Sequence, residues 1–146
     1  MDSHGAVSVD FIFATLIILI ISVGIIALAT ERMDATKEAE LGSARILAEY
    51  VAEAINKAYS GGNGHMVNIT LPSNINNRTN YSITVNSSGV YIRIDGRTGK
   101  AYIASKRITT NPTSPTDANI TMYPNNTYYI RNVRYNYTNW IVITQS

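Results

Sequence analysis

The residues best suited to chemistry in this chain are few and lie far apart in the sequence. The chain has no cysteine and only two histidines, His4 and His65, so thiol chemistry and a histidine-based metal site are both disfavoured. After residue 60 the only acids are Asp95 and Asp117, too few to indicate an acid–base pair. We therefore predict no catalytic residue, no metal site and no cofactor, and we expect a protein that is not an enzyme.

One charged residue has an unusual neighbourhood. Asp10 directly precedes Phe11–Thr30, 20 positions without a single ionisable side chain. At the start of a helix its carboxylate gains about 0.3–1 kcal/mol from the helix dipole. A carboxylate beside so apolar a helix nevertheless costs free energy unless a partner neutralises it. We therefore expect Asp10 to have a partner.

A second group of candidate residues is formed by seven Asn-x-Ser/Thr sequons, none of which has proline in the middle. The 14 asparagines after residue 60 would produce about three sequons by chance in so Ser- and Thr-rich a sequence. Strand alternation directs several of them away from apolar neighbours, so we predict N-glycosylation of an exported, exposed domain. The alternative is that they are ordinary polar residues of strands and turns. The candidates are Asn68, Asn77, Asn80, Asn86, Asn119, Asn125 and Asn136.

The apolar run that follows Asp10 is the first structural element that positions these candidate residues. A helix of 20 residues at ~1.5 Å per residue is long enough to cross a hydrocarbon core of about 30 Å. A secretory signal peptide cut after Ala29 is one alternative, although MDSHG lacks the basic residues of such a signal and the run is longer than usual. A permanent single-pass anchor is another.

The helix is predicted to continue well beyond Thr30. Residues 31–59 contain no proline and are rich in good helix formers. Gly24 and Gly42 are positions where this helix could bend or pack closely against another. Glu38, Glu40, Glu49 and Glu53 are interpreted as its solvated face. Its apolar stripe consists of Met33, Leu41, Ala44, Ala48, Val51, Ile55 and Ala58.

Beyond the long helix, which is expected to extend to residue 59, the sequence thus divides into a Gly-rich linker (60–65) and a β-rich head domain (66–146). The linker glycines cap the helix; no strand precedes them and no Lys-Ser/Thr follows, so they are not a phosphate loop. The net charge of +2, without a basic run, gives no indication of nucleic-acid binding.

After Gly64 the hydrophobic period changes from that of a helix to that of strands. Segments rich in Ile, Val, Thr and Tyr are predicted as strands at 66–71, 81–86, 90–95, 101–108, 118–123, 128–133 and 137–144. Hairpin turns are expected at 87–89 and 96–99, and the two-proline loop 111–116 is expected to cross between sheets or edges. The fold class is therefore α+β: a long N-terminal hydrophobic helix followed by an antiparallel β-sandwich or partly open barrel.

The segment Gly5-Ala6-Val7-Ser8-Val9-Asp10-Phe11 resembles the class III signal peptide of archaeal type IV pilins. The resemblance implies that residues 1–5 are a leader peptide cleaved after Gly5, so that the long helix spans 6–59. Ala6 is then the new amino terminus and Ser8 the third mature residue. Asp10 then occupies the fifth mature position, where the family usually has Glu. Ala6 stands where Gln is common, and His4 stands where Lys or Arg is usual.

By this resemblance the chain is a structural subunit of an adhesive archaeal surface filament. Copies would form a homopolymer through residues Ala6, Ser8, Asp10 and Phe11, with Asp10 paired to the free amino terminus of Ala6 in a neighbouring copy. The partners implied are prepilin peptidase, the pilus assembly machinery and, before assembly, the membrane. The alternatives are a minor pilin-like subunit, a monomeric membrane-anchored protein, or a secreted surface-binding module beginning at Thr30.

Overall fold

A computed structural model describes the backbone of residues 3–77 and 80–146, with side chains from residue 9 onward. The chain divides into two compact units, Met1–Ala39 and Glu40–Ser146, which we describe separately. Helix α1 (Ser3–Ser60, 58 residues) supplies all the described structure of the first unit and the first 21 residues of the second. The predicted long N-terminal helix is therefore confirmed.

Local chemistry explains where α1 ends. No proline interrupts it, and it remains helical through Gly24 and Gly42. Beyond Ser60 the backbone N–H of Gly61 still reaches the carbonyl of Lys57 at 3.0 Å, and Gly62 then adopts a left-handed conformation with φ of 80°. A left-handed glycine is the usual helix stop, because it has no Cβ to clash. The predicted glycine cap is confirmed.

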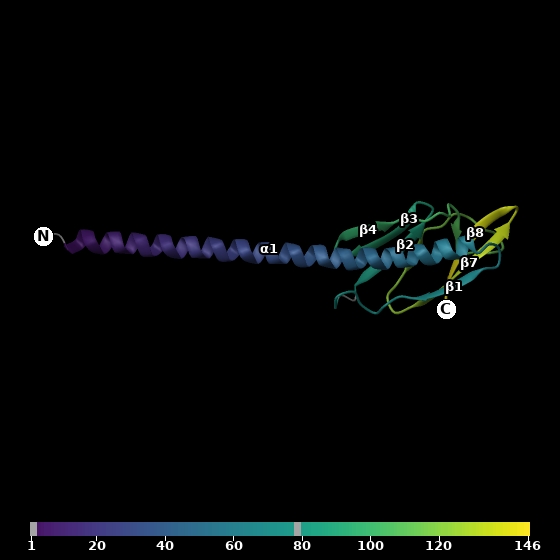
Figure 1. The fold of residues 1–146 in the computed structure, drawn as a ribbon, viewed down its shortest axis with the longest axis horizontal. Helices are drawn as coiled ribbons and strands as arrows, with labels where there is room; N and C mark the ends of the chain where they lie inside the picture. The colour runs from purple at the N-terminus through teal and green to yellow at the C-terminus, as the bar shows by residue number, and fades with distance from the viewer. Residues whose placement is uncertain (1–2, 78–79) are drawn as a thin grey trace. The chain divides into compact units, whose positions relative to one another are not determined.

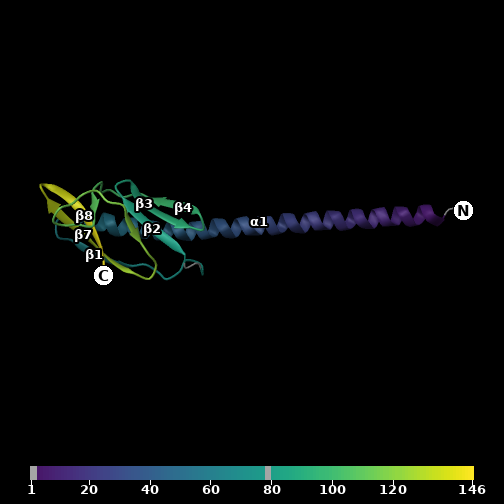
Figure 2. The same cartoon turned by 180° about the vertical axis from the view of Figure 1, so that it is seen from behind.

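The second unit contains two four-stranded sheets. One has the order β1-β7-β8-β5 and the other the order β4-β3-β2-β6. Figures 1 and 2 show these strands beside the C-terminal part of α1. The strands are β1 (Met66–Thr70), β2 (Tyr81–Asn86), β3 (Gly89–Ile94), β4 (Arg97–Ala101), β5 (Ile108–Thr109), β6 (Ile120–Met122), β7 (Thr127–Tyr135) and β8 (Thr138–Gln145).

Most of the sheet predictions are confirmed. Val90, Ile92 and Ile94 of β3 are buried, as the alternation predicts. The turn at 87–89 joins β2 to β3, with Asn86 paired to Gly89. The two-proline loop 111–116 leads from β5 in one sheet to β6 in the other, as expected. Neither sheet closes into a barrel within the described residues.

Three details of the sheets were predicted wrongly. The expected strand at 101–108 is a crossover between sheets, held by a turn in which the Ser105 Oγ accepts a hydrogen bond from the backbone N–H of Arg107 (3.3 Å). The second hairpin turn is Asp95-Gly96, both with positive φ, and not 96–99. The sheets are also not wholly antiparallel, because β5 pairs with β8 in parallel.

The C-terminal part of α1 contributes one side of a single core formed with both sheets. Its buried stripe begins later than predicted, since Met33 is 58% exposed and Leu41 is half-buried. Asparagines from the rest of the unit also bind the helix. Asn132 of β7 donates to the carbonyls of Ala58 (3.3 Å) and Tyr59 (2.9 Å). The buried helix residues are Ala44, Ala48, Val51, Ala52, Ala54, Ile55 and Ala58.

Candidate functional site

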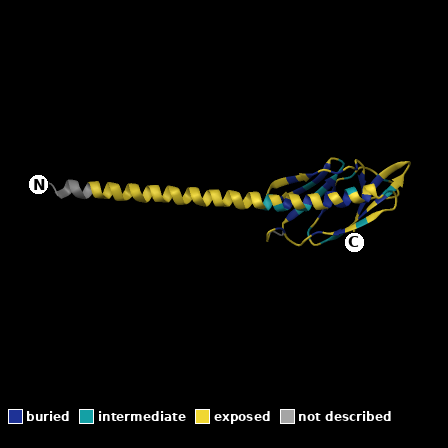
Figure 3. Ribbon diagram, viewed as in Figure 1, coloured by how far each residue is buried: buried dark blue, intermediate teal, exposed yellow. Residues whose placement is uncertain are grey.

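The candidate site is the apolar segment, which we define as Phe11–Thr30 of α1. All of its side chains are exposed, and the fractions for its large hydrophobic residues run from 53% at Leu16 to 71% at Phe11. Figure 3 shows this stretch in the colour of exposed residues, whereas buried and exposed residues alternate in the C-terminal part of α1. Among the described residues, α1 is the one helix long and apolar enough to cross a membrane. Such a surface requires lipid or another apolar surface to cover it.

The polar side chains of the apolar segment are satisfied within the helix itself. The segment has three, and each hydroxyl donates to the carbonyl four residues earlier: Thr15 to Phe11, Ser22 to Ile18 (2.7 Å) and Thr30 to Ile26 (2.9 Å). In hydrocarbon a polar group must find its partner inside the protein, because no water is present. The segment can therefore enter a dry environment without losing a hydrogen bond.

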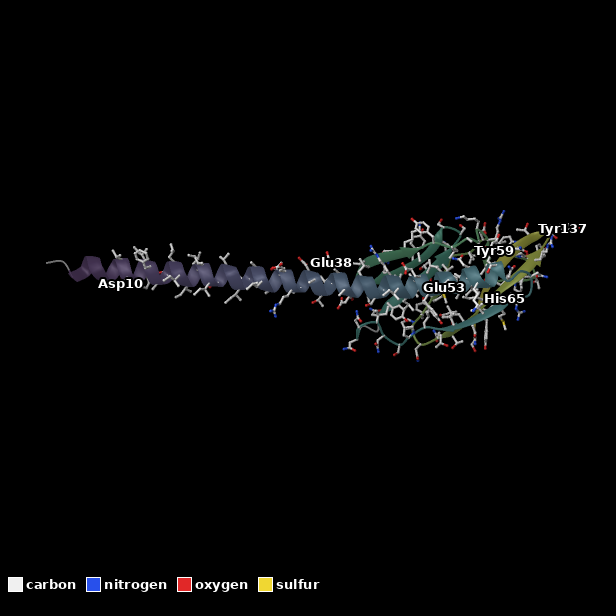
Figure 4. All side chains as sticks on the ribbon, viewed as in Figure 1. Asp10, Glu38, Glu53, Tyr59, His65 and Tyr137 are labelled. Carbon is white, nitrogen blue, oxygen red and sulfur yellow. The ribbon has the colours of Figure 1, made fainter. Side chains whose placement is uncertain are left out.

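Asp10 differs from those hydroxyls. Its side chain is exposed, and no hydrogen bond or ion pair joins it to another described residue. Figure 4 labels Asp10 on the helix at the start of the apolar segment. Gly5, Ala6 and Ser8 lie in the helical backbone of α1, and their side chains are outside the described set. Asp10 is the one polar side chain between Val9 and Thr30 that still needs a partner.

The sequon asparagines lie on the surface of the second unit. Six are exposed and Asn86 is half-buried, its Oδ1 accepting a hydrogen bond from the N–H of Ser88 (2.9 Å). Asn77, Asn125 and Asn136 have positive φ, so turn geometry alone favours asparagine there. That explanation does not extend to the other four. Two residues of the Asn77 sequon, Arg78 and Thr79, lie outside the described residues.

The acidic and tyrosine side chains that could take part in chemistry have contacts that stabilise the fold. The described residues contain no cluster of three or more His, Cys, Asp or Glu able to hold a metal ion. Asp117 forms an ion pair with Arg107 at 3.2 Å. The Tyr81 hydroxyl donates to the carbonyl of Pro72 (2.5 Å), and burial, with a smaller contribution from Tyr128, raises the pKa of Tyr81 to about 12.

One feature of the second unit was missed by the sequence analysis. A groove of about 460 Å³ lies between α1 and β4, and its lining includes Glu49, Glu53, Lys100 and Tyr102. The Lys100 ammonium lies over two tyrosine rings, 4.7 Å from the centroid of Tyr102 and 5.2 Å from that of Tyr91. Periodicity could not reveal the groove, because its two sides are about fifty residues apart in the sequence.

Comparisons with protein-family models, with curated proteins and with solved structures gave no match to this chain. The similarity to type IV pilins therefore rests on the residues around Gly5–Phe11 and on the architecture, a long apolar N-terminal helix followed by β-sheets.

Proposed function

We propose that this chain is a structural subunit of an archaeal type IV pilus-like surface filament, assembled through its N-terminal helix and adhesive in function. The observation that carries the proposal is the apolar segment: 20 residues with exposed side chains, internally satisfied hydroxyls and a single unpartnered acid at the start. A helix of this kind suits membrane anchoring and helix–helix assembly equally well.

The apolar segment would lie first in the membrane and then in the core of the filament. Before assembly, the apolar segment holds the subunit in the membrane. After removal of residues 1–5, it leaves the lipid and packs against the same segment of neighbouring copies in the filament core. Lipid and a bundle of Ile- and Leu-rich helices are similarly apolar, so the transfer depends on packing and polar pairing more than on a hydrophobic gain.

Asp10 would provide that polar pairing. Cleavage after Gly5 creates a positively charged amino terminus at Ala6, which can pair with the Asp10 carboxylate of an adjacent copy. In an apolar filament core an ion pair is favoured over either charge alone, and it fixes the axial register between copies. The β-rich part would then form the outer surface, where glycosylated asparagines and contacts with other surfaces are accessible.

The first test is the intact mass and amino-terminal sequence of the native protein from sheared cell-surface material. A chain that starts at Ala6 and is heavier than its sequence by sugar increments is expected. A start at Thr30 would instead indicate a conventional secreted domain. An uncleaved start confined to the membrane fraction would indicate a monomeric anchored protein.

The second test replaces the unpartnered acid. Asp10→Ala should leave the strands folded and the leader processed but lower filament yield by at least about tenfold, because an amino terminus buried without its partner costs several kcal/mol. Asp34→Ala is the matched control: Asp34 is an exposed acid on the same helix, and its ion pair with Lys37 is long at 3.9 Å. Normal filaments from Asp10→Ala would remove Asp10 from the mechanism.

A further inference from the structure

The sheet β1-β7-β8-β5 carries a pocket on the face turned away from the core. The pocket has a volume of about 390 Å³, within the range of small-molecule sites (about 300–1,000 Å³). Its residues come from three neighbouring strands, which Figures 1 and 2 show together, and from the loop after β5. The lining consists of Met66 in β1, Tyr129 and Arg131 in β7, Val142 and Thr144 in β8, and Pro112 in the loop.

The first sequon asparagine, Asn68, lies on the same face and next to this pocket. Three successive pairs of residues face each other across β1 and β7: Met66 with Arg131, Asn68 with Tyr129, and Thr70 with Thr127. In the first pair the guanidinium donates to the Sδ atom at 3.6 Å, and in the third pair the two hydroxyl oxygens are 2.9 Å apart. The middle pair therefore shares this face, and Cβ atoms of such partners are about 4.5–5.5 Å apart. A group attached to Asn68 thus begins beside Tyr129, at the edge of the pocket.

Asn68 has no structural role of its own that explains an asparagine at this position. Its side chain is exposed and forms no hydrogen bond with a described residue. Its φ is not positive, so it differs from the sequon asparagines whose turn geometry favours this residue type. The middle residue of the sequon, Ile69, is buried on the opposite face of β1. The amide nitrogen of Asn68 is therefore accessible for attachment of a sugar.

The lining of the pocket suits a sugar. A sugar ring has apolar C–H faces and a rim of hydroxyl groups, so it binds where apolar surface lies beside hydrogen-bonding groups. The side chains of Tyr129 and Met66, 36% and 47% exposed, offer the apolar surface. Arg131 forms no ion pair with a described residue, and the sulfur to which it donates is a weak acceptor, so its N–H groups remain available to sugar oxygens. The Thr144 hydroxyl can donate or accept one further bond.

We propose that this pocket binds the sugar attached to Asn68 of the same chain. The sugar ring packs on Tyr129 and Met66, and its oxygens accept hydrogen bonds from Arg131. The inference rests on the glycosylation that the proposed function includes. Because the sugar is held covalently beside the pocket, its effective concentration is high and weak contacts are enough to keep it bound. The sugar at Asn68 therefore covers apolar surface of the β-sheet and does not simply extend into solvent.

Oxidation of Met66 by hydrogen peroxide tests whether the sugar covers the pocket. The full chain is purified from its native cells in mild detergent, and peptide mapping by mass spectrometry gives both the occupancy of Asn68 and the rate of sulfoxide formation. Oxidation follows exposure, so Met66 should react at least about fivefold more slowly in the glycosylated protein than in Asn68→Gln. Met33 on α1 is 58% exposed and serves as the internal reference, with the same rate expected in both proteins.

Matched variants separate the sugar from other effects on Met66. Thr70→Ser keeps the sequon and should keep the protection, whereas Asn119→Gln removes the sequon that precedes β6 and should leave the Met66 rate unchanged. Tyr129→Val should leave Asn68 occupied but make Met66 oxidise faster, and it should have little effect in the Asn68→Gln background. Tyr135→Val is its control, because Tyr135 lies in the same strand with a similar exposure of 38% and does not line the pocket.

The outcomes distinguish this inference from the proposed function. An unmodified Asn68, or a Met66 that oxidises equally fast with and without the sugar, would overturn the sugar site, while filaments built from chains that start at Ala6 would still support the filament function. Slow oxidation of Met66 in a glycosylated chain that keeps its leader and stays in the membrane fraction would support the sugar site and contradict the filament function.

Discussion

Helix α1 contains two stretches built from similar residues in opposite surroundings. The apolar segment presents Ile, Leu, Val and Ala on all sides and exposes them. Residues 44–58 place Ala, Val and Ile on one stripe, bury that stripe under two sheets and turn Glu49 and Glu53 outward. The second stretch therefore has its partner within the chain, whereas the first must find one outside it. A helix that is apolar on every side is thus an indication of assembly or membrane insertion, and not of fold stability.

The same substitution in the two stretches should separate these roles most clearly. Ile55→Ala is expected to lower the free energy of unfolding by about 2–5 kcal/mol, because Ile55 is fully buried in the core. Ile20→Ala should change the free energy of unfolding by no more than about 0.5 kcal/mol, because Ile20 is exposed. Denaturant unfolding of the full chain in mild detergent, followed by Trp140 fluorescence, measures both. Equal losses would contradict the division between the two stretches.

Loss of the Asn132 side chain, which binds the C-terminal end of α1, should have the next largest effect on the free energy of unfolding. Asn132→Ala removes two hydrogen bonds to helix carbonyls, so a loss of about 1–3 kcal/mol in the free energy of unfolding is expected. The carbonyl of Tyr59 keeps a hydrogen bond from the N–H of Gly62 (3.3 Å). Thr15→Ala removes a hydroxyl that bonds only its own helix and should not change the unfolding of the sheets. The same denaturant series gives both values; an unchanged midpoint for Asn132→Ala would mean that α1 does not need this cap.

Alkaline pH should destabilise the second unit through Tyr81. Its folded pKa is raised to about 12 while an unfolded tyrosine titrates near 10. The neutral hydroxyl is thus favoured by folding, and this contribution is complete below pH 10 and is lost as the pH rises from 10 to 12. Stability should fall by about 1 kcal/mol at pH 11.

Unfolding midpoints between pH 9 and 12 measure this loss. Tyr81→Phe should flatten the profile, whereas Tyr102→Phe, at an exposed tyrosine, should not change it. A profile that is equally steep in Tyr81→Phe would assign the loss to another group.

The smallest effect is expected at the β7–β8 turn, where Tyr137 has a φ of 63° and is 93% exposed. A side chain in this conformation is strained, and Asn-Gly is the favoured pair for such a turn. Tyr137→Gly should therefore raise the free energy of unfolding of the second unit by about 0.5–1 kcal/mol. This gain is reduced by the loss of the contact between the Arg134 guanidinium and the Tyr137 ring, whose centroid is 5.9 Å away. Thermal unfolding measures the change, and Gly96→Tyr at the matching Asp95-Gly96 turn should shift the midpoint in the opposite direction.

Sequence patterns predicted the elements better than their spatial arrangement. Continuous helix formers and the glycine cap predicted α1, and strict alternation predicted which face of β3 is buried, because these are local properties. The crossover at 102–107 was mistaken for a strand because its Ile and Tyr residues have β propensity, while its turn depends on Ser105 and on Asn56, 48 residues before Ala104. The groove beside β4 was missed for the same reason. The exposed apolar segment was predictable, since no contact within the chain was needed to identify it.

Strand β8 has a consequence for the order of events during synthesis. It lies between β7 and β5, and it comes last among the described strands, with Ile141 and Ile143 buried in the core. The sheet cannot be completed until these residues have left the ribosome, more than a hundred residues after the apolar segment. The segment is thus free to engage a targeting factor or a membrane while the rest of the chain is still unfolded, so export in an extended state would require no unfolding step.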